Sequence, residues 1–217
     1  MMKNHYVRYL LAFLVLIVLC ALFAIKLWGM HPVHFWNRIM ADASFVMLCL
    51  TLIIGPAVQF VPRLWPLSPW RRELGVVAAL AALVHVVIYM KSFRWNPLGF
   101  FIERGTPHLV WKRDAFASSN WVGLLALGII LILALTANDF SQKWLGKGWK
   151  FLQQQNYGLF ALTFVHIFLF LYLVNEVSRG SVYTVFWWLS LITVGFQIAG
   201  FVRTVWLNAR RRGIIDP

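Results

Sequence analysis

The sequence predicts an all-α integral membrane protein, a six-helix transmembrane bundle with both termini in the cytoplasm. The 217 residues are 61% hydrophobic and only 12% charged, and the mean hydropathy of +0.72 is too high for a soluble domain. Six apolar stretches are long enough to cross the hydrocarbon core of a bilayer, which takes about 20 residues. The Lys and Arg residues lie in short clusters between these stretches, where they predict the orientation.

The six predicted spans follow one another without a linker or a second domain, so we expect one transmembrane domain over residues 1–217. The spans are Tyr9 to Leu27, Ala43 to Val61, Leu74 to Met90, Trp121 to Thr136, Tyr157 to Val174 and Tyr183 to Trp206. The first is interpreted as an anchor, since its apolar run is longer than a signal-peptide core and no convincing cleavage site follows it. The only long connection, Lys91 to Asn120, is expected to carry a short surface helix or a partner contact.

The charge distribution separates the two sides of the predicted bundle. The side that holds both termini collects twelve Lys and Arg residues and the other side eight, so the positive-inside rule places the termini in the cytoplasm. A formal charge of +13 is also compatible with nucleic-acid binding. We exclude that partner, because the basic clusters between apolar runs would face the headgroups of a lipid bilayer.

Two of the six histidines lie within predicted spans. His85 occurs in "AALVHVVIYM" and His166 in "LTFVHIFLFL". An ionisable group at membrane depth is expensive and normally faces the bundle interior. His85 follows Arg72 by 13 residues and His166 follows Gln153 by 13, so both are expected at similar depth, in the outward half of the membrane. Two neutral imidazoles on facing helices suit a haem iron, while two buried histidines with separate polar partners remain the alternative.

Two segments and a histidine carry a resemblance to a known family. The segments "RRELGVVAALAALVHVVIY" and "LALTANDFSQKWLGKGWKFL", followed by His166, resemble the ferric reductase-like transmembrane domain. Within that family, the chain is similar to the haem-binding membrane subunits of periplasmic methionine sulfoxide reductase systems. The resemblance covers about residues 40–175, which we take as the haem-binding core.

The resemblance implies haem ligands on the third and fifth spans. The outer histidine pair of the family matches His85 and His166, whereas Arg71 and Gln153 stand where two-haem members have their inner pair. Arginine is no haem ligand and glutamine is a poor one, so a single haem b is expected. Whether a second haem or a flavin binds despite Arg71 and Gln153 stays open at this point.

Residues next to His85 are candidates to contact the haem. Lys91 and Arg94 follow His85 at the predicted outer surface, where cations pair with anionic propionates or with lipid headgroups. Tyr89 lies four residues after His85 on the same helix face, and its hydroxyl would bond a propionate or anchor at the interface.

The sequence therefore predicts a multi-pass cytochrome b of the bacterial inner membrane, an electron-transfer subunit of an oxidoreductase. Its expected acceptor is a periplasmic reductase or ferric iron. The expected donor is a cytosolic flavoprotein or a quinol; no G-x-G-x-x-G fingerprint is present, so a flavin domain would belong to a separate protein. The alternative is a membrane scaffold or small transporter that lost the cofactor and uses His85 and His166 as buried polar contacts or a proton relay.

Overall fold

A computed structural model describes residues 2–103, 110–174 and 181–212. The described residues form α1 (Met2–Lys26), α2 (Pro32–Phe60), α3 (Trp70–Ser92), α4 (Ala115–Leu135), α5 (Asp139–Leu145), α6 (Lys147–Gln154), α7 (Asn156–Leu169) and α8 (Ser181–Arg211). Short 3-10 turns cover Pro62–Leu67 and Pro97–Phe100, and a π-helical turn, Phe170–Val174, extends α7. Six helical segments are long and apolar enough to cross a membrane. The predicted all-α class is confirmed, and the sidedness of the termini stays a prediction.

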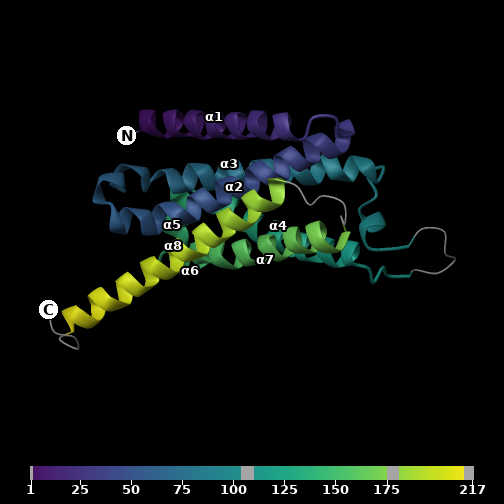
Figure 1. The fold of residues 1–217 in the computed structure, drawn as a ribbon. Helices are drawn as coiled ribbons and strands as arrows, with labels where there is room; N and C mark the ends of the chain where they lie inside the picture. Colours follow the sequence, from purple (N-terminus) through teal and green to yellow (C-terminus); the bar gives the residue numbers. More distant parts are fainter. Residues whose placement is uncertain (1, 104–109, 175–180, 213–217) are drawn as a thin grey trace.

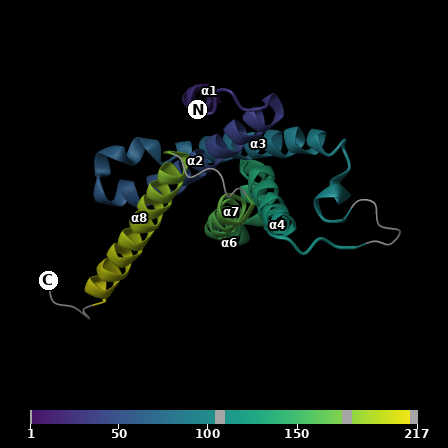
Figure 2. The same cartoon turned by 45° about the vertical axis from the view of Figure 1, so that its right-hand side comes forward.

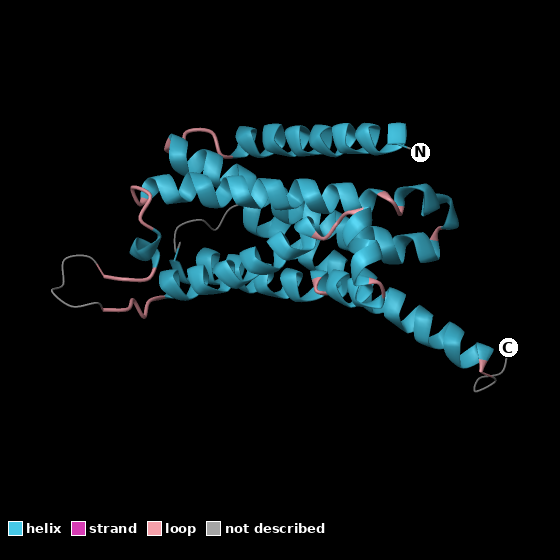
Figure 3. Cartoon of the chain, turned by 180° about the vertical axis from the view of Figure 1, so that it is seen from behind, coloured by secondary structure: helices cyan, strands magenta, loops and turns pink. Residues whose placement is uncertain are grey.

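The helices pack as two pairs with α1 and α8 added to one of them (Figures 1 and 2). α2 packs along α3, and α4 packs along α7. α1 lies over the α2–α3 pair, while α8 contacts α2 and then extends away from the bundle toward the C-terminus. Figure 3 shows the same arrangement from behind, with helices making up nearly all of the described chain. The site described below lies between the two pairs.

Two helices begin earlier than their apolar runs predict. α2 starts at Pro32 and not near Ala43, and α4 starts at Ala115 and not near Trp121. Pro32 is at the first turn of α2, where a missing N–H costs nothing. Asp114 caps α4, and its side chain accepts a hydrogen bond from the N–H of Ala117. The extra turns carry polar residues, which lower the local hydropathy although these residues are helical.

A proline near the C-terminal end of α2 lies at the contact with α8. Pro56 has no N–H, so the carbonyl of Leu52 loses its helical donor. The side chain of Gln197 on α8 donates Nε2 to that carbonyl oxygen at 2.6 Å. The neighbouring carbonyl of Thr51 accepts a bond from Nε of Arg71 on α3 at 3.0 Å. Hydrogen bonds thus connect this part of α2 to both α8 and α3.

Gly200 permits the close approach of α8 to Pro56. A Cβ at Gly200 would lie 2.9 Å from Cβ and 3.3 Å from Cγ of Pro56. We expect Gly200→Ala to destabilise the protein by about 1–3 kcal/mol through overpacking, measured as a lower Tm in detergent. Gly195→Ala is the matched control, because nothing lies within 4 Å of its Cβ position on the same helix. Equal Tm changes in the two variants would contradict the packing argument.

Candidate functional site

A cavity of about 330 Å³ lies between α2, α3, α4 and α7, and its lining includes both span histidines. We call it the outer cavity, after the end of the bundle that the sequence predicts to face outward. The lining atoms belong mostly to apolar side chains such as Phe45, Leu124 and Ile167. Cavities of about 300–1,000 Å³ with few polar groups are typical of small-molecule and cofactor sites. The structure thus brings His85 and His166 to one cavity of suitable size.

His85 on α3 is held by Asn37 on α2. Its ring Nδ1 lies 3.1 Å from the main-chain oxygen of Asn37. In return, Nδ2 of Asn37 donates to the main-chain oxygen of His85 at 2.8 Å. Because a carbonyl only accepts, Nδ1 of His85 carries the proton and Nε2 keeps its lone pair. This reciprocal pair fixes both the tautomer and the direction of the ring.

His166 on α7 is held in the same way by Ser119 on α4. Its Nδ1 lies 2.8 Å from the main-chain oxygen of Ser119. The hydroxyl of Ser119 lies 3.1 Å from the main-chain oxygen of His166 and also 3.1 Å from Nδ1. Ser119 is fully buried, so these contacts are shielded from solvent. The two histidines therefore share one arrangement, in which a polar residue near the start of the neighbouring helix orients the ring.

This arrangement leaves both Nε2 atoms free to bind a metal centre. Within the described part of the chain, neither Nε2 has a hydrogen-bond partner. Metal-binding histidines commonly donate their other ring N–H to a carbonyl, which sets the tautomer and raises the basicity of the ligand. Two such imidazoles from facing helix pairs, in a mainly apolar cavity, would suit the iron of a haem. The residues present therefore fit the cofactor that the sequence predicts.

The outer cavity also contains polar groups that sequence reasoning did not select. Nε of Arg38 lies 2.9–3.0 Å from both carboxylate oxygens of Asp42, and both side chains line the cavity. No described residue accepts a hydrogen bond from the terminal nitrogens of Arg38. Asn120 lines the same cavity, and its Nδ2 is buried without a hydrogen-bond partner among the described residues. These donors are available to an anionic group of a ligand.

The three further candidates from the sequence are placed differently. Tyr89 lines the outer cavity, and its ring is nearly parallel to that of His85, with centroids 6.4 Å apart and an interplanar angle of 10°. Tyr89 also stacks on Phe100, another residue of the cavity lining. Lys91 and Arg94 are exposed and lie outside the cavity lining. Their contact with a cofactor stays a prediction.

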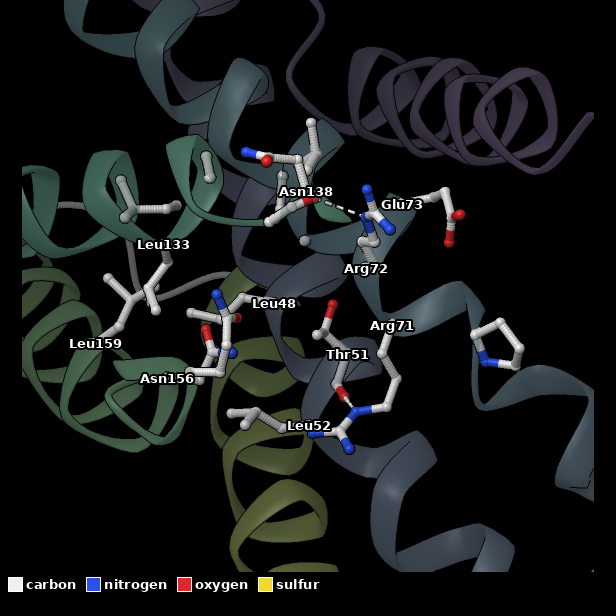
Figure 4. Close-up of a pocket in the computed structure, with 18 of the residues that line it drawn as sticks. Leu48, Thr51, Leu52, Arg71, Arg72, Glu73, Leu133, Asn138, Asn156 and Leu159 are labelled. Atoms are coloured by element: carbon white, nitrogen blue, oxygen red, sulfur yellow. Dashed lines mark hydrogen bonds between the residues drawn. The ribbon is translucent and has the colours of Figure 1, made fainter. Parts of the chain in front are cut away.

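A second cavity of about 540 Å³, the inner cavity, lies at the opposite end of the bundle (Figure 4). Both residues at the predicted inner-ligand positions, Arg71 and Gln153, line it. Arg71 bonds the main chain of Thr51, and Nε2 of Gln153 lies 3.4 Å from the hydroxyl of Thr136. The two side chains therefore make helix-to-helix hydrogen bonds within this cavity.

Cations surround the inner cavity. Arg8, Arg71, Arg72 and Lys150 line it, against one fully buried carboxylate, Glu73. Glu73 is paired with Arg8 and His5 of α1, at 3.0 Å each. Arg72 donates to the exposed carboxylate of Asp139 at 2.6 Å, and this hydrogen bond holds the pKa of Asp139 below its usual value. The net positive lining favours an anionic ligand.

A thin apolar wall separates the two cavities. Leu48, Ile130 and Leu159 line both of them. These three side chains belong to one buried hydrophobic cluster. Figure 4 shows Leu48 and Leu159 on the side of the inner cavity away from Arg71 and Glu73. A ligand in one cavity would thus be one layer of side chains away from a ligand in the other.

Sequence reasoning found the two histidines and missed the residues that hold them. Asn37 and Ser119 lie outside the predicted spans, in the segments read as loops. A signal was nevertheless present at α4, where Asp114 is a typical N-cap residue three positions before Ala117. At α2 the Pro32 start gave a similar signal. Asn37 and Ser119, in the second turns of these helices, would then have been placed on helices and become site candidates.

Comparison with known proteins gives matches to haem-binding and ferric reductase-like membrane proteins. Residues 40–164 match the family described as "Ferric reductase like transmembrane component". The chain is 32% identical over 142 residues to the magnetosome protein MamZ of Paramagnetospirillum magneticum, covering 65% of this chain and 20% of that protein. It is 29% identical over 138 residues to the protein-methionine-sulfoxide reductase heme-binding subunit MsrQ of Brucella ovis, covering 64% of this chain and 58% of that protein. The match thus spans only part of each relative.

Proposed function

The chain belongs to the ferric reductase-like transmembrane family, and from this premise we propose that it is a b-type cytochrome with one haem between His85 and His166. The observation that supports this most is the pair of ring nitrogens, each oriented by its own Nδ1 hydrogen bond, on one cavity. A bound haem would supply one-electron redox chemistry. The chain would then carry single electrons through the membrane as the electron-transfer subunit of an oxidoreductase.

The side chains around the outer cavity would each hold one part of the cofactor. His85 and His166 would ligate the iron through Nε2. Arg38 and Asn120 offer N–H donors to the anionic propionates, since both line the cavity with nitrogens that the described residues leave unpaired. Tyr89 packs beside His85 and limits its ring motion. Lys91 and Arg94 lie near the end of α3, where they would contact propionates only at the rim.

The acceptor is proposed to lie on the outer side of a bacterial cytoplasmic membrane. The outer cavity lies toward the end that the positive-inside rule predicts to face outward. One relative is described as the heme-binding subunit of a protein-methionine-sulfoxide reductase, which favours a separate periplasmic reductase as the acceptor. Ferric iron is the other acceptor that the family name suggests.

The inner cavity is the proposed entry point of the electron donor. It stands where a two-haem relative would hold its inner haem, and only the Leu48, Ile130 and Leu159 wall separates it from the outer cavity. Its cationic lining favours a phosphate-bearing flavin from a cytosolic flavoprotein over a neutral quinol. The volume of about 540 Å³ is within the usual range of cofactor sites.

A charge reversal at the inner cavity tests the donor. Lys150 lines this cavity and Lys147 on the same helix does not. We expect Lys150→Glu to slow reduction by reduced flavin mononucleotide several-fold in stopped-flow measurements and to leave reduction by a short-chain quinol unchanged. Lys147→Glu, which changes the net charge equally, should alter neither rate. Slower reduction by both donors, or by quinol alone, would contradict a flavin site.

The absorption spectrum of the purified protein tests the cytochrome itself. Protein expressed with ample haem and purified in detergent should show a six-coordinate b-type spectrum that changes on reduction with dithionite, with one haem per chain. Two haems per chain would contradict the assignment of Arg71 and Gln153 as non-ligands. Colourless protein would reject the cytochrome and favour a membrane scaffold or small transporter, in which His85 and His166 are buried polar contacts.

A further inference from the structure

The ring of His166 lies directly on the backbone of Gly123 in α4. A Cβ added at Gly123 would be 2.8 Å from Nδ1 and 2.9 Å from Cε1 of His166, and 3.5 Å from its Cγ. Carbon atoms of real side chains do not approach this closely, so any residue other than glycine would displace the ring. Gly123 also lines the outer cavity. We infer that Gly123 is a positioning residue, whose missing side chain lets His166 present Nε2 to the haem iron; this inference rests on the proposed function.

The hydrogen bond of His166 lies beside the same stretch of backbone. The ring reaches the main-chain oxygen of Ser119, which lies four residues before Gly123 on α4. That oxygen faces the Cβ position of residue 123, because residues four apart are neighbours on one face of a helix. The missing side chain at Gly123 therefore leaves room for the ring of His166 and gives the ring access to the main-chain oxygen of Ser119.

The other histidine provides an internal comparison. Ala41 lies four residues after Asn37 on α2, as Gly123 lies four residues after Ser119 on α4. The distance from ring Nδ1 to the carbonyl oxygen is 3.1 Å for His85 and 2.8 Å for His166. The His85 pair therefore tolerates an alanine at this position, whereas a Cβ at residue 123 would lie 2.8 Å from Nδ1 of His166. The need for glycine follows from the placement of the His166 ring and applies to that side alone.

Displacement of the ring has a specific spectroscopic consequence. In Gly123→Ala the methyl group breaks the bond to Ser119 and turns Nε2 away from the iron, while His85 keeps its own pair with Asn37. A haem would then be held by His85 alone, and less of it would be retained, as in the absence of His166. We expect the electron paramagnetic resonance signal of the retained haem, normalised to haem content, to be mostly high-spin and not low-spin, and the reduced protein to bind carbon monoxide readily.

A second variant on α4 serves as the matched control. Gly128→Ala adds the same methyl group to the same helix where nothing lies within 4 Å, so the spectrum should stay low-spin. A low-spin Gly123→Ala protein without carbon monoxide binding would overturn the inference and leave the cytochrome assignment intact. Haem-free wild-type protein would instead reject the proposed function.

A double variant separates ring placement from general misfolding. Gly123→Ala/His166→Gly lacks the ring that the methyl group would strike, so it should accumulate as well as His166→Gly alone. Added imidazole should restore the low-spin spectrum in both proteins, because a free ring can shift by the few tenths of an ångström that the tethered ring cannot. Poor accumulation of the double variant beside normal accumulation of His166→Gly would show a packing role for Gly123 and overturn the inference.

Discussion

Replacing either His85 or His166 by alanine is expected to abolish six-coordinate haem binding and to lower the haem content of the purified protein at least tenfold. Each ring supplies one Nε2 to the outer cavity, and the described residues around it offer no other histidine or cysteine ligand. A tenfold loss corresponds to about 1.4 kcal/mol, less than a metal–imidazole bond contributes. The measurement is the ratio of haem absorbance to protein in detergent, together with the reduced-minus-oxidised spectrum.

Matched histidine substitutions show whether the effect is specific. His31 lies just before α2 and its side chain is exposed, so His31→Ala should keep the full haem content. Gln153→Ala should also keep it, because Gln153 lines the inner cavity and not the outer one. Normal haem content in both His85→Ala and His166→Ala would place the cofactor elsewhere. Loss in Gln153→Ala as well would indicate a ligand at the inner cavity.

The number and type of the membrane helices follow from the sequence because apolar runs must match the bilayer thickness. All six predicted spans overlap helices of the structure. The two histidines were also identifiable, since a polar ring inside an apolar run is expensive and needs a reason. These predictions depend on the composition of single segments, which can be judged without knowledge of tertiary contacts.

The residues that complete the site were not predictable from the same composition. Asn37, Arg38 and Asp42 on α2 and Ser119 and Asn120 on α4 lowered the hydropathy of their segments, so both segments were interpreted as loops. In the structure these side chains line the outer cavity or bond its histidines. Asn37 and Ser119 are tolerated at that depth because they bond residues of neighbouring helices, and Arg38 and Asp42 because they pair with each other. A prediction from local hydropathy fails at such functional residues, because contacts with other helices stabilise their polar side chains.

The ion pair of Arg38 and Asp42 provides the second large effect. Both side chains are less than one-fifth exposed, at 18% and 15%, and they lie one helical turn apart on α2. Arg38→Met leaves the Asp42 carboxylate in an apolar cavity without its cation, so it must either stay unpaired or take up a proton. We expect a loss of about 3 kcal/mol in the free energy of unfolding, seen as a lower Tm of the haem-free protein in detergent.

The double variant Arg38→Met/Asp42→Leu distinguishes stability from cofactor binding. Replacing both charges by apolar groups removes the unpaired carboxylate, so the Tm should return close to that of the wild type. The haem affinity should stay reduced, because the guanidinium proposed to hold a propionate is still absent. Full haem affinity in the double variant would restrict Arg38 to a structural role. Lys91 and Arg94 are exposed and lie outside the cavity lining. Lys91→Met and Arg94→Met should therefore lower the haem affinity less than Arg38→Met does. A larger loss of haem affinity in either variant would place the propionate contact at the rim of the cavity.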